Sequence, residues 1–430
     1  MKKNLYYLSA ILLFVSCVEN KNNNGNTNIK YSHYDIQLYV DPDDQFIKVK
    51  GNLKYLVETD SLDVLSFKLH EQLIINKFSV NGDSTYEIDT ISNKIRWIPN
   101  AINIIYQTKE NFKKGDILNV DFSYEGIISR WSPWSANVIG PEWIEMGLYL
   151  PWYPSFYGPF TYRVSIDIEP RFNVFAIGKA TVKDNKRIFE TNIPVGDLII
   201  CASKDLNVRK IELMNHSFKI VNCTLSDATI DSIQNDIKHF YQLYNEWFGR
   251  IEEQDMCLVI SKREKGGGYA RKGGLFLGGI NHTDYIDNRL AYNRYLGHEI
   301  AHFWWTGAEN NWEDWLNESF AEYSALMLIK ELVGTEEFIS RLSKKRDESS
   351  NTPPIWELDR NSSSTQLVLY SKGVVLLNEL DDKIGNKRFL ELCREVIRKN
   401  INNTSDFLNL LKEREGQEIG NWFEQSLKTR

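Results

Sequence analysis

The chain has 430 residues, of which 42% are hydrophobic and 25% charged, and its formal net charge at pH 7 is −7. A chain of this length usually forms two or three domains, because one domain typically holds roughly 100–200 residues. The hydrophobic share is that of an ordinary globular protein with a sizeable core. The acidic balance, with no long basic run interleaved with aromatic residues, excludes nucleic acid as an expected partner.

The first residues are typical of a targeting segment rather than of a fold. Two lysines follow Met1, and the apolar run 5–15 is too short to span a bilayer. It ends in Leu-Phe-Val-Ser-Cys at 13–17, which resembles a bacterial lipoprotein signal. The resemblance implies a signal peptide over 1–16 and a lipid on Cys17 that anchors the protein to a membrane of the bacterial cell envelope, on the periplasmic or cell-surface side of the outer membrane. An ordinary secretory signal is the alternative.

Residues 17–29 are rich in asparagine and poor in apolar side chains, which predicts a flexible tether. From residue 30 to 203, apolar and polar residues alternate in runs that are separated by turn-forming residues. Such alternation predicts antiparallel strands with one buried face. Runs of this kind lie at 34–40, 47–57, 120–124 and 162–168. We therefore expect a β-rich N-terminal domain over residues 30–203.

The pattern changes after residue 203, and residues 204–430 are predicted to form a second, α+β domain. Apolar residues recur at helical spacing from Ile230 to Phe248, and Gly249 is expected to end that helix. A buried strand is expected at 256–261, before a glycine-rich stretch. Further helices are expected at about 288–305, 313–332 and 367–384.

Residues with metal-ligand spacing lie in the first of these later helices, in the segment His-Glu-Ile-Ala-His. His298 and His302 are four residues apart, so both imidazoles lie on one helix face and can bind one zinc ion. Glu299 points towards the same cleft without binding the metal, and there it can take a proton from a water that zinc activates. The pattern therefore predicts a zinc site with Glu299 as the catalytic base.

A third ligand is expected on the next predicted helix, in the segment Trp-Leu-Asn-Glu-Ser-Phe-Ala. Glu318 would complete a His₂Glu site with a fourth position open for water. Glu322, one helical turn later, is a candidate to orient a ligand, although a solvated helix carboxylate is an equally good interpretation. The expected cofactor is one Zn²⁺ ion.

These segments resemble the motifs of the M1 family of zinc aminopeptidases, a gluzincin family with an HExxH helix, a later WLNEGFA segment and a YxKG segment. The YxKG segment matches residues 370–373, which implies that Tyr370 donates a hydrogen bond to the oxyanion of the reaction. The resemblance also implies a multidomain α+β fold, in which a saddle-like antiparallel β domain precedes a thermolysin-like catalytic domain. The implied activity is hydrolysis of peptide bonds in a peptide or protein substrate.

The sequence departs from the family pattern in three respects. The spacer between His302 and Glu318 holds 15 residues, fewer than is usual in the family, and the chain ends at Arg430 without the family's large helical C-terminal domain. The substrate-binding GxMEN segment is degenerate, because an alanine stands where a glutamate binds the α-amine of the substrate. Its counterpart here is Gly267, Gly268, Tyr269, Ala270 and Arg271.

The missing glutamate leaves more than one mode of cleavage open. An aminopeptidase is the leading expectation, and Glu142, Glu145 or Glu264 could then replace the lost carboxylate. Alternatively Arg271 or Lys272 binds an anionic group of the substrate, which would give an endopeptidase or a carboxylate-anchored exopeptidase. A non-catalytic peptide-binding lipoprotein is a second alternative, although a binding protein does not need a general base.

Overall fold

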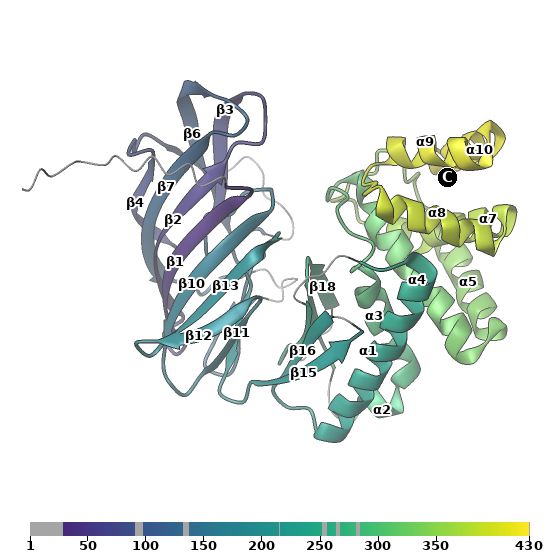
Figure 1. Ribbon diagram of the computed structural model, residues 1–430, viewed down its shortest axis with the longest axis horizontal. Coiled ribbons are helices and arrows are strands. Elements are labelled where there is room, and N and C mark those ends of the chain that lie inside the picture. Colours follow the sequence, from purple (N-terminus) through teal and green to yellow (C-terminus); the bar gives the residue numbers. More distant parts are fainter. Residues whose placement is uncertain are drawn as a thin grey trace, which may run out of the picture. The chain divides into compact units, whose positions relative to one another are not determined.

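The computed structural model describes residues 29–90, 98–131, 137–214, 216–251, 256–263, 267–280 and 284–429 (Figure 1). The predicted signal peptide, Cys17 and most of the predicted tether lie outside these residues, and so does Glu264. Within the described ranges, no helix is long and apolar enough to cross a membrane. Contacts group Tyr31–Arg430 into one unit.

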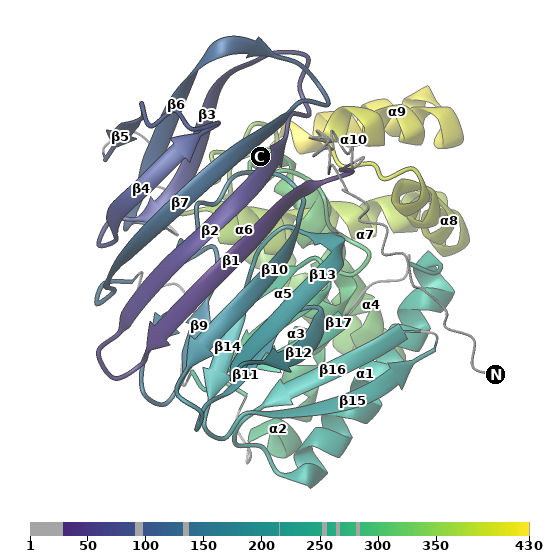
Figure 2. The same ribbon diagram turned by 60° about the vertical axis from the view of Figure 1, so that its left-hand side comes forward.

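The part before Ser203 consists of β-strands, as the alternating pattern predicts. Its largest sheet has the strand order β12-β13-β10-β1-β2-β7-β4 (Figure 2). Neighbouring strands are antiparallel except for β1 and β10, which run parallel with Tyr34 beside Tyr162. The strands of this sheet are β1 (Ser32–Asp41), β2 (Phe46–Leu56), β4 (Ile74–Val80), β7 (Ile117–Ile127), β10 (Phe160–Ile168), β12 (Lys179–Lys183) and β13 (Lys186–Val195).

Two smaller sheets complete this part of the chain. One has the order β3-β6-β5, and the other has the order β11-β14-β9-β8. Aromatic side chains such as Phe67, Phe122 and Trp152 are fully buried in the shared core, and burying each stabilises the fold by about 2–3 kcal/mol. The strands are β3 (Leu62–His70), β5 (Glu87–Asp89), β6 (Ala101–Phe112), β8 (Val138–Ile139), β9 (Ile144–Met146), β11 (Asn173–Ala176) and β14 (Ile200–Ser203).

A five-stranded sheet with the order β15-β16-β17-β19-β18 follows. Its side chains alternate between two cores: Leu258 faces the helices, whereas Cys257 and Val259 face the core of the β-rich part. The glycine-rich β18 is the edge strand, and its neighbour β19 runs antiparallel to it. The strands are β15 (Asn207–Leu213), β16 (His216–Asn222), β17 (Met256–Ile260), β18 (Gly267–Arg271) and β19 (Gly274–Gly278).

Helices make up most of the remaining chain, and the first of them, α1 (Asp227–Phe248), ends as predicted at Gly249, whose φ is 90°. Ser226 caps its other end by accepting a hydrogen bond from the Thr229 amide. The later helical elements are α2 (Asp284–Asp287), α3 (Arg289–Ala301), η1 (Trp312–Asp314), α4 (Trp315–Val333), α5 (Thr335–Ser349), α6 (Thr365–Leu367), η2 (Val368–Lys372), α7 (Gly373–Ile384), α8 (Asn386–Arg398), α9 (Thr404–Glu415) and α10 (Gln417–Leu427).

The helix expected to reach residue 305 is shorter, because α3 ends at Ala301. The amides of Phe303 and Trp304 bond to carbonyl oxygens three residues earlier, which tightens the chain into a turn. His302 still has helical dihedral angles, with φ −64° and ψ −10°. Its side chain therefore stays on the helix face that also carries His298.

Candidate metal centre and active site

His298, His302 and Glu318 each bring one ligand atom to a common point, and these atoms lie within 4.8 Å of one another. Nε2 of His298 is 3.2 Å from Nε2 of His302. Oε2 of Glu318 lies 3.4 Å from Nε2 of His298 and 3.7 Å from Nε2 of His302. The structure thus brings together the three residues that the sequence analysis predicts as ligands of a single ion.

The three ligands converge because α3 and α4 pack closely. A Cβ atom added at Gly297 would come within 2.6 Å of Leu328 on α4 and 3.2 Å of the Tyr244 hydroxyl on α1. That hydroxyl donates a 2.9 Å hydrogen bond to the Gly297 carbonyl oxygen. A glycine at this position therefore lets the helix with both histidines approach the helix that carries Glu318.

The second ring nitrogen of each histidine has a hydrogen-bond acceptor. Nδ1 of His302 is 3.0 Å from the carbonyl oxygen of Trp305, and Nδ1 of His298 is 3.0 Å from Oε2 of Glu322. A carbonyl oxygen or a carboxylate can only accept, so the proton of each neutral ring sits on Nδ1. Both Nε2 atoms then direct a lone pair at the common point.

The donor set fits zinc. Two imidazole nitrogens and one carboxylate oxygen are ligands that zinc binds in catalytic sites. Oε2 of Glu318 is buried and has no hydrogen-bond partner among the described residues, which would be costly unless a cation balanced it. Glu299 is not among the potential ligands, so the Glu299 carboxylate stays available for proton transfer.

Glu322 is a buried carboxylate rather than a solvated one, since only 1% of it is exposed. Its Oε1 accepts hydrogen bonds from Arg294 at 2.6 Å and from Lys345 at 2.7 Å. Burial alone would raise the pKa of Glu322, but the bond to His298 and the nearby cationic side chains hold this pKa well below its ordinary value. The ionised carboxylate therefore keeps the proton of His298 on Nδ1.

Arg294 and Lys345 were not singled out by the sequence. Arg294 lies four residues before His298 on α3, so helical spacing could have indicated a shared face. Lys345 lies on α5 and also donates a 2.7 Å hydrogen bond to the carbonyl oxygen of Tyr370. No local sequence signal connects it to the site.

Glu299 lies directly beside the edge strand β18. A Cβ atom added at Gly268 would come within 2.8 Å of Oε1 of Glu299 and 2.6 Å of the Tyr295 hydroxyl, so a side chain at this position would displace these groups. Glu299 is 6% exposed, and this burial raises the pKa of its carboxyl group above the ordinary glutamate value. A raised pKa suits a group that takes up and releases a proton near neutral pH.

Tyr370 lies in η2, a π-helical turn between α6 and α7. Its ring stacks on the ring of His298, with centroids 5.5 Å apart and an angle of 24° between the planes. Burial, followed by the negative charge of Glu318, raises the pKa of Tyr370 well above its ordinary value. The hydroxyl therefore stays protonated and can donate a hydrogen bond beside the metal ligands.

The side chains of the degenerate GxMEN segment point to both sides of β18. Gly268 faces Glu299, and Ala270, two residues on, packs against the core that contains α3. Tyr269 points to the opposite side and donates a 2.8 Å hydrogen bond to Oε1 of Glu145. The backbone of this strand and its glycines can contact a substrate, but the side chain of Tyr269 cannot.

The contacts of Arg271 do not favour the hypothesis that it binds an anionic group of the substrate, which stays a prediction. Its guanidinium group is 3.2 Å from the carboxylate of Asp197, of which 1% is exposed, and it lies over the rings of Tyr149 and Tyr269. These contacts face the β-rich part of the chain. Arg271 therefore attaches the edge strand to that part and does not face Glu299.

The carboxylates that could replace the lost glutamate are also engaged elsewhere. Glu145 is fully buried and accepts hydrogen bonds from Trp143, Ser261 and Tyr269. Glu142 is 69% exposed and pairs with Lys262 at 3.3 Å. Neither carboxylate lines the pocket beside the metal ligands.

That pocket has a volume of about 550 Å³. Gly267, Gly268, His298, Glu299 and Tyr370 line it on the side of the predicted chemistry. Four residues of α5, which we call the α5 wall, also line it: Arg341, Lys344, Lys345 and Glu348. The pocket therefore brings the predicted base, a predicted metal ligand, the tyrosine and the edge strand together around one space.

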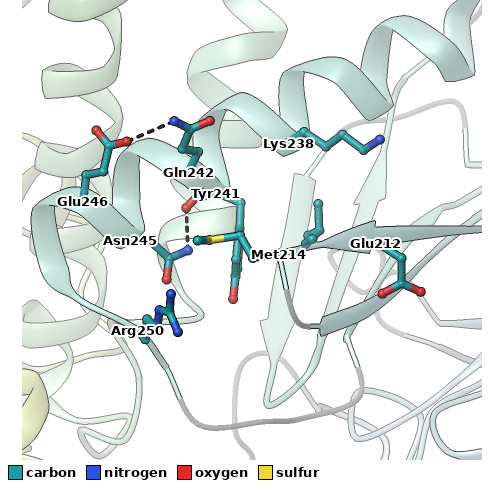
Figure 3. A pocket seen from close by; sticks show the side chains of 9 residues that line it. Glu212, Met214, Lys238, Tyr241, Gln242, Asn245, Glu246 and Arg250 are labelled. Atoms are coloured by element: carbon teal, nitrogen blue, oxygen red, sulfur yellow. Dashed lines mark hydrogen bonds between the residues drawn. The ribbon is translucent and has the colours of Figure 1, made fainter.

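Two other pockets differ in composition. One of about 450 Å³ lies between α1 and the β15–β16 hairpin, and it contains no predicted site residue (Figure 3). The larger one, of about 860 Å³, contains His302 and Lys272 but none of Glu299, Glu318 and Tyr370. The pocket of about 550 Å³ is therefore the candidate active site.

Residues 279–425 match the sequence model described as the peptidase family M1 domain. No curated protein matches the chain. Similar solved structures include the M1 zinc metallopeptidase from Deinococcus radiodurans, with a TM-score of 0.71 and 16% identity over 93% of this chain and 95% of that chain. A mutant of that enzyme bound to a Tyr-Ser-Ala substrate has a TM-score of 0.68 and 16% identity, over 93% and 94% of the two chains. Native leukotriene A4 hydrolase from Saccharomyces cerevisiae has a TM-score of 0.67 and 18% identity, over 92% of this chain and 67% of that chain.

Proposed function

We propose that the protein hydrolyses peptide bonds with one zinc ion held by His298, His302 and Glu318, because residues 279–425 match the model of the peptidase family M1 domain and the described chain has a fold similar to that of an M1 zinc metallopeptidase. The observation that carries this proposal is the convergence of the three ligand atoms within 4.8 Å. The base and the tyrosine lie around the same pocket. When bound, zinc would polarise the scissile carbonyl group and activate water.

The residues of the chain supply the remaining steps. The carboxylate of Glu299 accepts a proton from the attacking water and later delivers it to the nitrogen of the leaving amine, as the C–N bond breaks. The Tyr370 hydroxyl donates a hydrogen bond to the oxygen on which negative charge develops. The exposed edge of β18 binds the peptide backbone in extended form beside Glu299.

Within this class, an aminopeptidase is the first candidate, because the motifs are those of a family of aminopeptidases. An endopeptidase is the second candidate, and a specific observation favours it. Ala270 lies where the amine-binding glutamate is expected, and Glu142 and Glu145 do not line the pocket. A substrate without a free amine could therefore still bind.

Cleavage of one hexapeptide in two forms, with a free and with an acetylated N-terminus, tests these candidates. The zinc-loaded protein is incubated with each form, and mass spectrometry identifies the products. Release of single N-terminal residues from the free form alone would establish an aminopeptidase. Internal cleavage of both forms would establish an endopeptidase.

The Glu299→Gln variant is the control for this experiment, because it should retain zinc and lose turnover. Hydrolysis by this variant at the wild-type rate would contradict the mechanism. Cleavage of neither peptide by the zinc-loaded wild type would favour the alternative of a non-catalytic peptide-binding lipoprotein.

We also propose that the protein is anchored to a membrane of the bacterial cell envelope by a lipid on Cys17. The support is the resemblance of residues 1–17 to a lipoprotein signal. The test is incorporation of labelled palmitate, together with the membrane-bound fraction after cell lysis. Both should be lost in a Cys17→Ser variant, and a variant that is still labelled would overturn the proposal.

A further inference from the structure

The α5 wall presents charge to the candidate active site. Arg341, Lys344, Lys345 and Glu348 are spaced at i, i+3, i+4 and i+7, so they lie on one face of α5. The adjoining face carries Phe338 and Leu342, which are buried in the helical core. Packing of the apolar face therefore turns three cationic side chains and one carboxylate towards the pocket that contains Glu299 and Tyr370.

The cationic side chains of this pocket have different partners. Arg294 and Lys345 both bond to Oε1 of Glu322 at 2.6 and 2.7 Å, and Lys345 also bonds to the Tyr370 carbonyl oxygen. These two cations are held in place by buried acceptors. They balance Glu322 and are not free to turn towards a substrate.

The other two cations are more loosely held. Lys344 is 78% exposed, and its Nζ is 3.9 Å from Glu348. Arg341 pairs with Glu337 at 2.7 Å, but Glu337 is 37% exposed and does not line the pocket. Only 27% of the Arg341 side chain is exposed, but its partner is solvated, and ion pairs that water can reach contribute little. A substrate carboxylate could therefore compete for both side chains.

We propose that Arg341 and Lys344 on the α5 wall form a subsite for a carboxylate of the substrate. This inference rests on the proposed peptidase function and assigns it a substrate class, namely peptides with a carboxylate near the cleaved bond. The carboxylate is either the C-terminus of a short peptide or an acidic side chain. The protein would then recognise the substrate by this carboxylate and not by its α-amine, because Ala270 cannot bind an amine.

Binding to the zinc-loaded Glu299→Gln protein tests the proposal without requiring cleavage. Calorimetry compares Leu-Ala-Ala as the free acid and as the C-terminal amide, and Leu-Glu-Ala amide with Leu-Gln-Ala amide. We expect a carboxylate-bearing peptide to bind about three- to tenfold more tightly than its neutral partner. The first pair identifies the C-terminus as the source, and the second pair identifies an acidic side chain.

When Arg341→Gln and Lys344→Ala are added to the Glu299→Gln protein, the ratio of the two affinities in each pair should fall to about one. Adding Lys344→Glu alone should reverse the preference. Lys387→Ala is the matched control, because Lys387 is an exposed lysine on α8 that does not line the pocket. A preference that survives the α5 substitutions, or no preference in either pair, would overturn the proposal. Hydrolysis by the wild type is measured separately, so failure of the peptidase function is distinguishable from failure of this subsite.

Discussion

Replacing Glu322 by glutamine should weaken zinc binding, although Glu322 is not a ligand. One oxygen of Glu322 is 3.0 Å from Nδ1 of His298, and the other accepts hydrogen bonds from Arg294 and Lys345. Glutamine has only one oxygen, and two cations attract it more strongly than a neutral ring does. Its amide nitrogen then faces His298 and donates to Nδ1, so the ring proton moves to Nε2 and blocks the atom that faces the metal.

The size of the effect follows from this change of tautomer. Loss of a residue that orients a metal ligand typically lowers metal affinity about 10–100-fold, which equals about 1.4–2.7 kcal/mol. Glu322→Ala should cost a similar amount, because it removes the acceptor that holds the proton of His298 on Nδ1. Both variants should keep the fold at neutral pH, so the loss should appear in metal binding before it appears in structure.

The assay is competition for zinc between the protein and a chelator of known affinity, with circular dichroism as the check on folding. Glu331→Gln is the matched control, because Glu331 is an exposed glutamate near the end of the same helix. Zinc affinity of Glu322→Gln within a factor of about two of the wild type would refute the tautomer argument. If Glu331→Gln also lost zinc affinity, any change of charge on α4 would have this effect.

Three further outcomes are expected. Tyr370→Phe should lower kcat about 100- to 1,000-fold with KM and zinc content nearly unchanged, because the hydroxyl acts on charge that develops during the reaction; steady-state kinetics with metal analysis measures this. The rate should fall as pH drops through the raised pKa of Glu299, so the apparent pKa of the acid limb in the kcat/KM profile should lie above the ordinary glutamate value. Any residual activity of Glu299→Gln should show no such limb. Arg271→Met should lower the free energy of unfolding by about 3 kcal/mol, since it leaves the buried carboxylate of Asp197 unpaired; urea denaturation measures this.

Each of these three predictions can be contradicted by one result. A Tyr370→Phe enzyme with wild-type kcat would remove the hydroxyl from the mechanism. An acid limb at or below the ordinary glutamate pKa would show that burial does not control Glu299. An Arg271→Met protein with unchanged stability and a raised KM would indicate substrate binding by Arg271 instead of attachment of the edge strand.

Local patterns in the sequence predict several of the elements and the candidate metal ligands. Alternation of apolar and polar residues indicates the strands of the first half, and helical spacing with Gly249 indicates the bounds of α1. The four-residue separation of His298 and His302 places both rings on one helix face, whatever that helix packs against. Together with the motif around Glu318, this is why the sequence alone predicts the zinc site.

Tertiary structure decided the features that depend on distant segments. Tyr370 stacks on His298 across 72 positions of the chain (298 to 370), Lys345 joins Glu322 to Tyr370, and Asp197 draws Arg271 away from the pocket. A periodic pattern shows which face of an element is buried, but it does not show which segment covers that face. The partner of a buried charge is set by packing between elements, because an ion must find an opposite charge wherever the fold brings one.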